Sequence, residues 1–136
     1  MRAVCPVTRI MIGGHELMKQ YWIYMLECEN GSYYTGYTDD LARRYREHRT
    51  GSARSRYTRS FKPLRIACCW KVDADRGQAM SVESFIKSQA RNVKEAIVEN
   101  PGILARLLKS ERGESPVLEA VDPGTIETGP RVTGTA

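Results

Sequence analysis

Ionisable side chains stand at positions of this chain where helical periodicity normally places apolar residues. In the segment that begins at Leu41, positions 41, 44, 45 and 48 follow the i, i+3, i+4, i+7 spacing of an inward helical stripe, and they include Arg44 and His48. Glu83 occupies the same kind of position in a later helical segment. Because a buried unpaired charge costs several kcal/mol, these groups either lie at a solvated rim or line a site.

A block of basic residues indicates what such a site would bind. Residues 43–65 contain nine Lys or Arg and one acidic residue, Glu47, which gives this window a formal charge of +8. Such a block favours polyanions, because neutralising phosphates releases condensed counterions. Within it, residues 52–63 read as a loop that interleaves cations with Tyr57 and Phe61, which suits single-stranded or distorted nucleic acid. The alternative is a solvated loop whose aromatic rings fold back onto the core.

A hairpin and a helix are expected to position Arg44 and His48. Residues 21–29 and 32–37 read as antiparallel strands around an Asn-Gly pair, since both turn residues tolerate the positive φ of a two-residue turn. The helix that follows has Thr38 or Asp39 as its N-terminal cap and Gly51 as its stop.

The later segments complete a small α/β (α+β) fold. Clean alternation predicts a third strand over 64–72, and helical patterns predict helices over 76–90, 92–99 and 101–110. The predicted architecture is a three-stranded antiparallel sheet flanked by helices in the order β-β-α-β-α-α. We expect the two helices that carry Arg44 and Glu83 to aim these groups at the same patch of the sheet.

The 136 residues, 41% of them apolar, fit one domain. Residues 1–20 show no clear period and are expected to be a disordered extension, of which the first 17 residues are either non-native or follow an upstream start. Residues 21–110 form the expected domain. Residues 111–136 are rich in proline, glycine and acidic residues and are expected to be a disordered tail.

Composition also narrows the class of protein. The four cysteines form no C-x-x-C pair and no zinc-like cluster with histidine, so we expect reduced thiols and a cytoplasmic protein. No run approaches the roughly 18 apolar residues of a membrane span, and the start of the chain lacks the apolar core of a secretion signal.

The order of several short motifs is specific. WIYML at the first strand, NGSYY and Tyr34-Thr35-Gly36 at the turn and second strand, RRYREH in the helix, Arg56-Tyr57-Thr58 and a later Glu83 occur in this order. Together they resemble the GIY-YIG endonuclease domain, most closely its small stand-alone bacterial members, over about residues 21–98. Trp22 replaces the first glycine of the family motif and Thr35 its isoleucine, both at positions that vary in such proteins.

The resemblance implies a chemistry for these residues. The family hydrolyses phosphodiesters with one divalent cation, here Mg²⁺ or Mn²⁺ held by Glu83, acting as a Lewis acid. Arg44 would face the phosphoryl oxygens, where charge grows in the transition state. Tyr24, assisted by Tyr34 or His48, would position and deprotonate the attacking water.

The basic block would hold the nucleic acid beside this centre. Gly36 would end the second strand where a side chain would crowd the scissile phosphate. The residues expected to contact the nucleic acid are Gly36, Arg43, Arg54, Arg56, Tyr57, Arg59 and Lys62.

The resemblance thus implies a metal-dependent endonuclease that cuts DNA, is selective for structure or single strands, and acts in repair or recombination. Taken singly, the tyrosines could serve cross-strand packing, and Arg44 and His48 could bind phosphate without aiding its cleavage. The alternative function is therefore a non-catalytic module that binds DNA or RNA. An adaptor whose tail recruits a nuclease is a third reading.

Overall fold

The computed structural model describes residues 19–51 and 56–127. Its centre is an antiparallel sheet with strand order β2-β1-β3-β4, formed by β1 (Lys19–Cys28), β2 (Tyr33–Thr38), β3 (Pro63–Ala74) and β4 (Leu118–Val121). The predicted α/β class and the antiparallel sheet between helices are confirmed. The prediction of three strands is wrong, because the chain adds a fourth strand after its last long helix.

The β1–β2 hairpin turns through three residues rather than the predicted two. Cys28 and Ser32 close the turn, with the Cys28 amide donating to the Ser32 carbonyl at 2.9 Å and the Gly31 amide donating to the Cys28 carbonyl at 2.8 Å. Gly31 has a φ of 85°, and no non-glycine residue in the described ranges has a positive φ. Asn30 therefore does not adopt the conformation that a two-residue type I′ turn requires, and Gly31 alone supplies the left-handed residue of a three-residue loop.

Local capping explains where two site-bearing helices begin. Helix α1 (Leu41–Thr50) starts after Asp40, whose side chain accepts from the Arg43 amide at 3.1 Å, so the predicted cap at Thr38 or Asp39 is wrong by one or two positions. The helix ends, as predicted, at Gly51 in the left-handed region. Helix α3 (Arg76–Lys87) starts with a capping box between Asp75 and Gln78.

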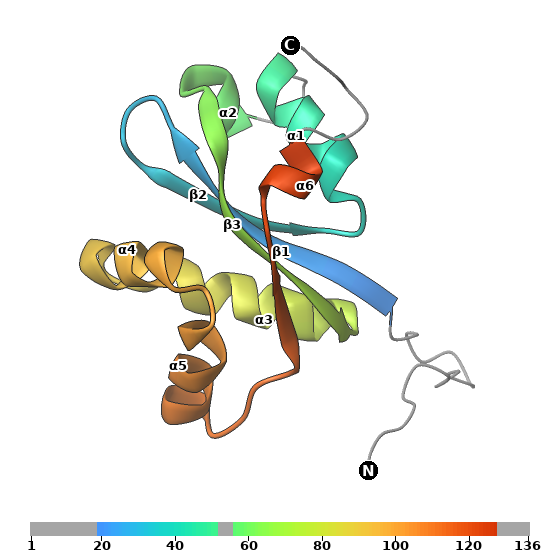
Figure 1. Cartoon of the computed structure of the whole chain (residues 1–136), viewed down its shortest axis with the longest axis vertical. Helices are drawn as coiled ribbons and strands as arrows, with labels where there is room; N and C mark the ends of the chain where they lie inside the picture. The colour runs from blue at the N-terminus through green and yellow to red at the C-terminus, as the bar shows by residue number, and fades with distance from the viewer. Residues whose placement is uncertain (1–18, 52–55, 128–136) are drawn as a thin grey trace.

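Helices cover both faces of the sheet. Helices α3, α4 (Arg91–Glu99) and α5 (Ile103–Arg112) lie on one face, and α1, α2 (Arg56–Ser60) and α6 (Gly124–Glu127) lie on the other (Figure 1). Within the part of the chain that the structure describes, no helix is long and apolar enough to cross a membrane.

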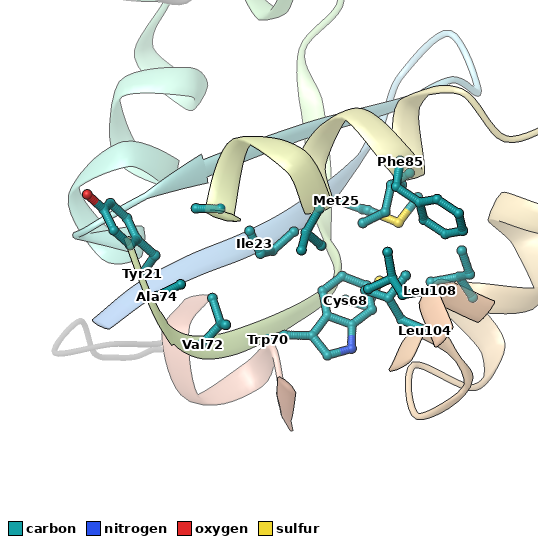
Figure 2. Close-up of a cluster of buried hydrophobic side chains, with 14 of the residues drawn as sticks. Tyr21, Ile23, Met25, Cys68, Trp70, Val72, Ala74, Phe85, Leu104 and Leu108 are labelled. Atoms are coloured by element: carbon teal, nitrogen blue, oxygen red, sulfur yellow. The ribbon is translucent and has the colours of Figure 1, made fainter. Parts of the chain in front are cut away.

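Each face of the sheet has its own core. The larger core packs the α3, α4 and α5 side against inward residues of β1 and β3, including Ile23, Met25 and Trp70 (Figure 2). The smaller core lies under α1 and contains Tyr24, Leu26, Leu41, Tyr45, Ile66 and Cys69, among others. Alternation along β1 sends Tyr24 to the smaller core and its neighbours to the larger one.

The prediction that residues 111–136 form a disordered tail is wrong for the part that the structure describes, which ends at residue 127. β4 pairs with β3, and its two largest apolar residues pack against different cores, Leu118 against the larger and Val121 against the smaller. Ile126 of α6 also packs against the smaller core. β4 thus provides hydrogen-bond partners for backbone groups on the outer edge of β3. No local pattern in this proline-rich and glycine-rich segment predicts that pairing.

Two further expectations are changed. Residues 56–60, predicted as part of a loop, form the short helix α2. Lys19 and Gln20, predicted to belong to a disordered extension, begin β1. Residues 1–18 and 128–136 lie outside the described ranges, so the expectations for them stay predictions.

Candidate active site

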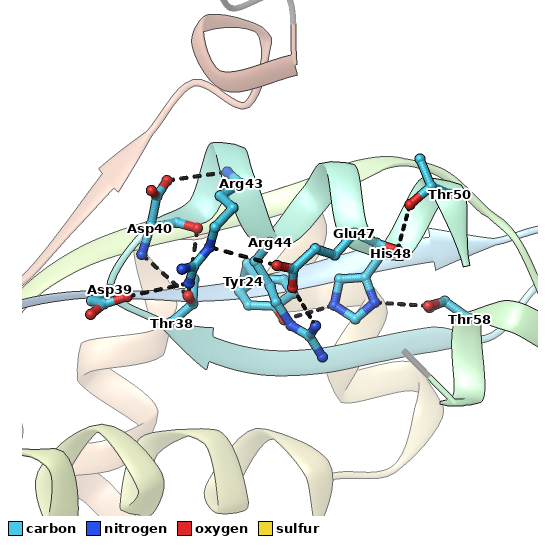
Figure 3. A network of polar contacts seen from close by, with 10 residues as sticks. All are labelled: Tyr24, Thr38, Asp39, Asp40, Arg43, Arg44, Glu47, His48, Thr50 and Thr58. Atoms are coloured by element: carbon cyan, nitrogen blue, oxygen red, sulfur yellow. Dashed lines mark hydrogen bonds and ion pairs between the residues drawn. The ribbon is translucent and has the colours of Figure 1, made fainter. Parts of the chain in front are cut away.

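The residue pair at the centre of the site joins β1 to α1. The Tyr24 hydroxyl lies 2.9 Å from His48 Nε2, and both side chains are 1% exposed (Figure 3). The Tyr34 ring of β2 packs edge-on against the His48 ring, with centroids 4.9 Å apart, and lies 6.4 Å from the Tyr24 ring. Three of the predicted residues are therefore in one contact cluster.

Gly36 makes room for Tyr24. The two residues are opposite each other in the β1–β2 ladder, and a Cβ built at Gly36 would lie 2.5 Å from the Tyr24 hydroxyl oxygen. The phenol therefore lies across β2, over a residue that has no side chain. The expectation that a side chain at this position would crowd a phosphate stays a prediction; the crowding that the structure shows is against Tyr24.

Replacing Gly36 with alanine is expected to displace the Tyr24 hydroxyl and break its hydrogen bond to His48. Urea denaturation should show a loss of about 1–3 kcal/mol in unfolding free energy, the usual range for an added methyl in a packed site. Gly124→Ala is the matched control, because its Cβ would meet no atom closer than 3.5 Å. Equal stability of the two variants would contradict the packing argument.

Arg44 brings a positive charge close to the Tyr24–His48 pair and also contacts Glu47. Its Nη1 lies 2.8 Å from Oε1 of Glu47 (Figure 3), and its charge acts on the nearby Tyr24 phenol. Burial opposes the charge of Arg44, but the hydrogen bond to Glu47 and the nearby Tyr24 leave its pKa above the ordinary value. The Arg44 side chain is 17% exposed, so it stays accessible from one side.

Burial sets the protonation states of the central pair. It raises the pKa of Tyr24, as does the nearby Tyr34, against the opposing effect of Arg44. Burial and the charge of Arg44 lower the pKa of His48 to about 4. At neutral pH the site therefore holds a protonated phenol beside a neutral imidazole.

Glu83 lies on α3, which covers the other face of the sheet. Helices α1 and α3 lie on opposite faces, so the expectation that both aim at one patch of the sheet is wrong in its simple form. However, α3 packs against β2, the edge strand over which the Tyr24 phenol lies. The charge of Glu83 accordingly contributes to the raised pKa of Tyr24.

The chemistry of the donor set fits a loosely held Mg²⁺ or Mn²⁺. Glu83 is 18% exposed and pairs with Lys87 at 3.2 Å. Among residues 19–51 and 56–127, no group of three or more His, Cys, Asp or Glu could hold a metal ion. Mg²⁺ commonly keeps several waters and binds through one or two carboxylates together with substrate phosphates. Glu83 could supply one such carboxylate.

The aromatic residues of α2 extend the cluster outward. Tyr57 stacks on Tyr34 with ring centroids 5.7 Å apart, and its hydroxyl lies 2.6 Å from Ser32 Oγ. Phe61 lies next to Tyr57, and both are 38% exposed. The rings therefore contact the site and still present surface to solvent, and their stacking on nucleic acid stays a prediction.

The basic residues predicted to contact nucleic acid differ in their exposure and in their ion pairs, and some of them are not described. Arg43 is exposed but lies within 3.6 Å of Asp39 and 3.7 Å of Glu47, so part of its charge is already balanced. Lys62 is exposed. Arg54 lies outside the described residues, and the side chains of Arg56 and Arg59 on α2 are not described, so their contacts with nucleic acid stay predictions.

Two polar residues that carry the site were not among the predicted ones. Glu47 holds both Arg43 and Arg44 from within α1. Thr58 of α2 is 1% exposed, and its Oγ1 lies 2.8 Å from His48 Nδ1. Thr58 stood in a recognised motif, Arg56-Tyr57-Thr58, which was the available signal. Its partner was not predictable, because a segment interpreted as a loop gave no direction for its side chain.

Known proteins share this part of the chain. The GIY-YIG catalytic domain matches residues 20–96. A UPF0213 protein of Halalkalibacterium halodurans is 38% identical over 82 residues, which cover 60% of this chain and 85% of that protein. A UPF0213 protein of Fusobacterium nucleatum is 37% identical over 92 residues, covering 68% and 90% of the two chains.

A solved structure is also similar. The solution NMR structure of a UPF0213 protein from Bacillus halodurans is 38% identical, covers 59% of this chain and 83% of its own, and gives a TM-score of 0.39. The β4–α6 segment lies beyond the residues that the GIY-YIG domain matches. Since that match covers more than half of the chain, this protein belongs to the GIY-YIG catalytic domain family.

Proposed function

We propose that this protein is a metal-dependent endonuclease that hydrolyses phosphodiester bonds in DNA. The observation that carries the proposal is the hydrogen-bonded pair of Tyr24 and His48, buried between the hairpin and α1, with the charge of Arg44 acting on both residues. A packed core has no need for three ionisable groups close together, whereas phosphoryl transfer uses a cation and a proton acceptor side by side. The absence of a sequence-reading module in the matched domain favours selectivity for branched or single-stranded DNA, as repair and recombination require.

Arg44 would bind the phosphate. Its guanidinium contacts Glu47 at 2.8 Å and remains 17% exposed, so it could face the phosphoryl oxygens of a bound nucleic acid. Because Glu47 holds the guanidinium, its planar group is oriented before the substrate arrives. Such preorganised donors act most strongly where charge develops in the transition state.

Tyr24 and His48 would take the proton of the attacking water. The raised pKa of Tyr24 keeps the phenol protonated at neutral pH, so it could take a proton from water only by passing its own proton to a partner. The neutral His48, 2.9 Å away, is the available acceptor. The charge of Arg44 is one cause of the lowered pKa of His48. A bound phosphate would cancel part of that charge and make His48 a stronger base when substrate is present.

Glu83 would hold a divalent cation, Mg²⁺ or Mn²⁺. Bound there, the cation would act as a Lewis acid on the phosphate and stabilise charge on the leaving oxygen. Lys87, which pairs with Glu83 at 3.2 Å, would have to give up that carboxylate.

The test is cleavage of end-labelled flap, fork and single-stranded DNA by pure protein with Mg²⁺ or Mn²⁺. Glu83→Gln keeps the side-chain shape and is expected to lower the cleavage rate by about 10²-fold or more, the scale of losing one electrostatic contact to the transition state. Glu95→Gln is the matched control, because Glu95 is an exposed glutamate paired with Arg91 on α4. Cleavage by Glu83→Gln at the wild-type rate would refute the metal-dependent mechanism.

The second candidate is a module that binds DNA or RNA without cutting it. The ion pair between Glu83 and Lys87 favours it, because this carboxylate already has a cation. In that case no substrate is cut by wild type, Arg44→Ala weakens binding and flattens its salt dependence, and Glu83→Gln binds as well as wild type or better.

A further inference from the structure

A run of aromatic rings leads from the candidate site to the surface of the protein. The Tyr34 ring lies 4.9 Å from the His48 ring, measured between centroids. Tyr57 stacks on Tyr34 at 5.7 Å with the two planes 26° apart, and Phe61 follows at 5.3 Å from Tyr57. His48 is buried, whereas Tyr57 and Phe61 are exposed. The run therefore begins at a buried ring of the site and ends at two rings that solvent reaches.

Two contacts with the β1–β2 turn hold the outer rings in place. The Tyr57 hydroxyl lies 2.6 Å from Oγ of Ser32. The Glu29 amide donates to the carbonyl of Lys62, the residue after Phe61, at 2.8 Å. Because the segment that carries both rings is fixed to the turn, little conformational freedom remains to be lost when a ligand stacks on them.

Exposed apolar side chains gather beside the site. In the described ranges, the large apolar side chains that are exposed are Tyr57, Phe61, Leu64, Met80 and Val117. Three of them lie in residues 57–64, within the basic block of residues 43–65. Apolar rings among cations suit single-stranded nucleic acid, because bases stack on the rings while the cations hold phosphates. Rings that served only to cover His48 would be better buried, and they would need no cations around them.

We propose that Tyr57 and Phe61 form a stacking platform for an unpaired base of single-stranded DNA, and that Phe61 makes the site prefer unpaired to paired DNA. In a duplex, each base is stacked between its neighbours, so a duplex offers phosphates to this surface but no free base face. A single strand offers both. Lys62, next to Phe61, is exposed and would contact a phosphate of the same strand.

The role of this platform in cleavage rests on the proposed function. Since the aromatic run begins at the His48 ring, a base stacked on Phe61 would bring its own strand to the Tyr24–His48 pair. Flaps and forks carry unpaired bases next to a duplex, so the same contact would place their single-stranded arm beside the site. Phe61 would thus determine specificity, and binding in the absence of metal would already show it.

Binding without a divalent cation tests the platform apart from cleavage. The probes are a short oligothymidylate, an abasic strand with the same number of phosphates, and a duplex of the same length. All three offer phosphates, but only the oligothymidylate offers unpaired bases. We expect wild type to bind the oligothymidylate about 5-fold or more tighter than the abasic strand, the lower end of what one base stacked on an aromatic ring contributes.

Variants of Phe61 test which ring carries this preference. Phe61→Leu removes the ring but keeps an apolar side chain, so we expect it to lose most of the preference and to bind the abasic strand and the duplex as wild type does. Phe61→Trp keeps an aromatic face and should retain the preference. A 2-aminopurine in the oligothymidylate should be quenched less by saturating Phe61→Leu than by wild type. Met80→Leu is the matched control, because Met80 is also exposed but lies on α3, outside the basic block.

Equal affinity of wild type for the oligothymidylate and the abasic strand would overturn the proposal without any variant. So would a Phe61→Leu protein that keeps the wild-type preference. If Phe61→Leu changed the oligomeric state in sedimentation and left the preference intact, the rings would belong to a protein interface, and the proposal would fail. Failure of the endonuclease proposal is a separate outcome, because wild type that prefers unpaired bases but cuts no DNA with Mg²⁺ or Mn²⁺ keeps the platform and loses the endonuclease.

Discussion

Arg44→Lys is expected to lower kcat by about 10²–10³-fold although it keeps the positive charge, because it removes preorganised donors rather than charge. Arg44 donates to Glu47 at 2.8 Å with a rigid planar group that lies near the Tyr24 phenol. A lysine ammonium is a point charge on a flexible chain and cannot hold the Glu47 contact while facing a phosphate with further donors. Single-turnover cleavage with excess enzyme measures the effect on the chemical step.

Arg43→Lys is the matched control for this prediction. Arg43 is the neighbouring arginine of α1, is 49% exposed, and makes longer contacts with Asp39 and Glu47. Its replacement should leave the single-turnover rate near that of wild type, since exposed ion pairs contribute little. If Arg44→Lys changed affinity for DNA and left the rate of the bound complex unaltered, Arg44 would be a binding residue, as in the non-catalytic alternative.

The stability of the protein is expected to fall as the pH drops through the range in which His48 is protonated in the unfolded chain. The pKa of His48 is lowered from 6.5 to about 4 in the folded protein. Between these values the unfolded chain binds more protons than the folded one, so acidification favours unfolding. The contribution is fully present above about pH 6.5, and its loss amounts to about 2 kcal/mol at pH 5 and about 3 kcal/mol at pH 4.

Urea denaturation at pH 7, 5 and 4 checks this prediction. Carboxylates also titrate over this range, so the wild-type curve alone does not isolate His48. His48→Gln removes the titrating ring, and its stability should fall less with acidification, by about the amounts given above. Parallel pH profiles of the two proteins would mean that folding leaves the pKa of His48 unchanged.

Local pattern was sufficient for much of this fold. The alternation of β1, β2 and β3, the helical stripe of α1 and the glycine at its end predicted the hairpin, the first helix and the antiparallel class. The same pattern singled out Arg44 and His48 as polar residues on an inward face. These features depend on neighbours a few residues apart, which is why a sequence displays them.

Contacts between residues far apart in the sequence decided the remaining features of the fold. Leu118 and Val121 form a strand because the edge of β3 and two separate cores are available to them. Their proline-rich and glycine-rich surroundings, taken alone, are typical of disorder. For the same reason, the number of strands could not be predicted from the local pattern.

For the site, too, part could be predicted from the sequence and part depended on the tertiary structure. The sequence by itself determined which residue types were present and which of them belonged to the family motifs, including Tyr24, Gly36 and Glu83. Only the tertiary structure decided that Gly36 lies under the Tyr24 phenol, that Glu83 acts on Tyr24 from the opposite face, and that Thr58 is the second partner of His48. The direction of a hydrogen bond depends on all the donors around an atom, and those around Tyr24 and His48 come from segments brought together only by folding.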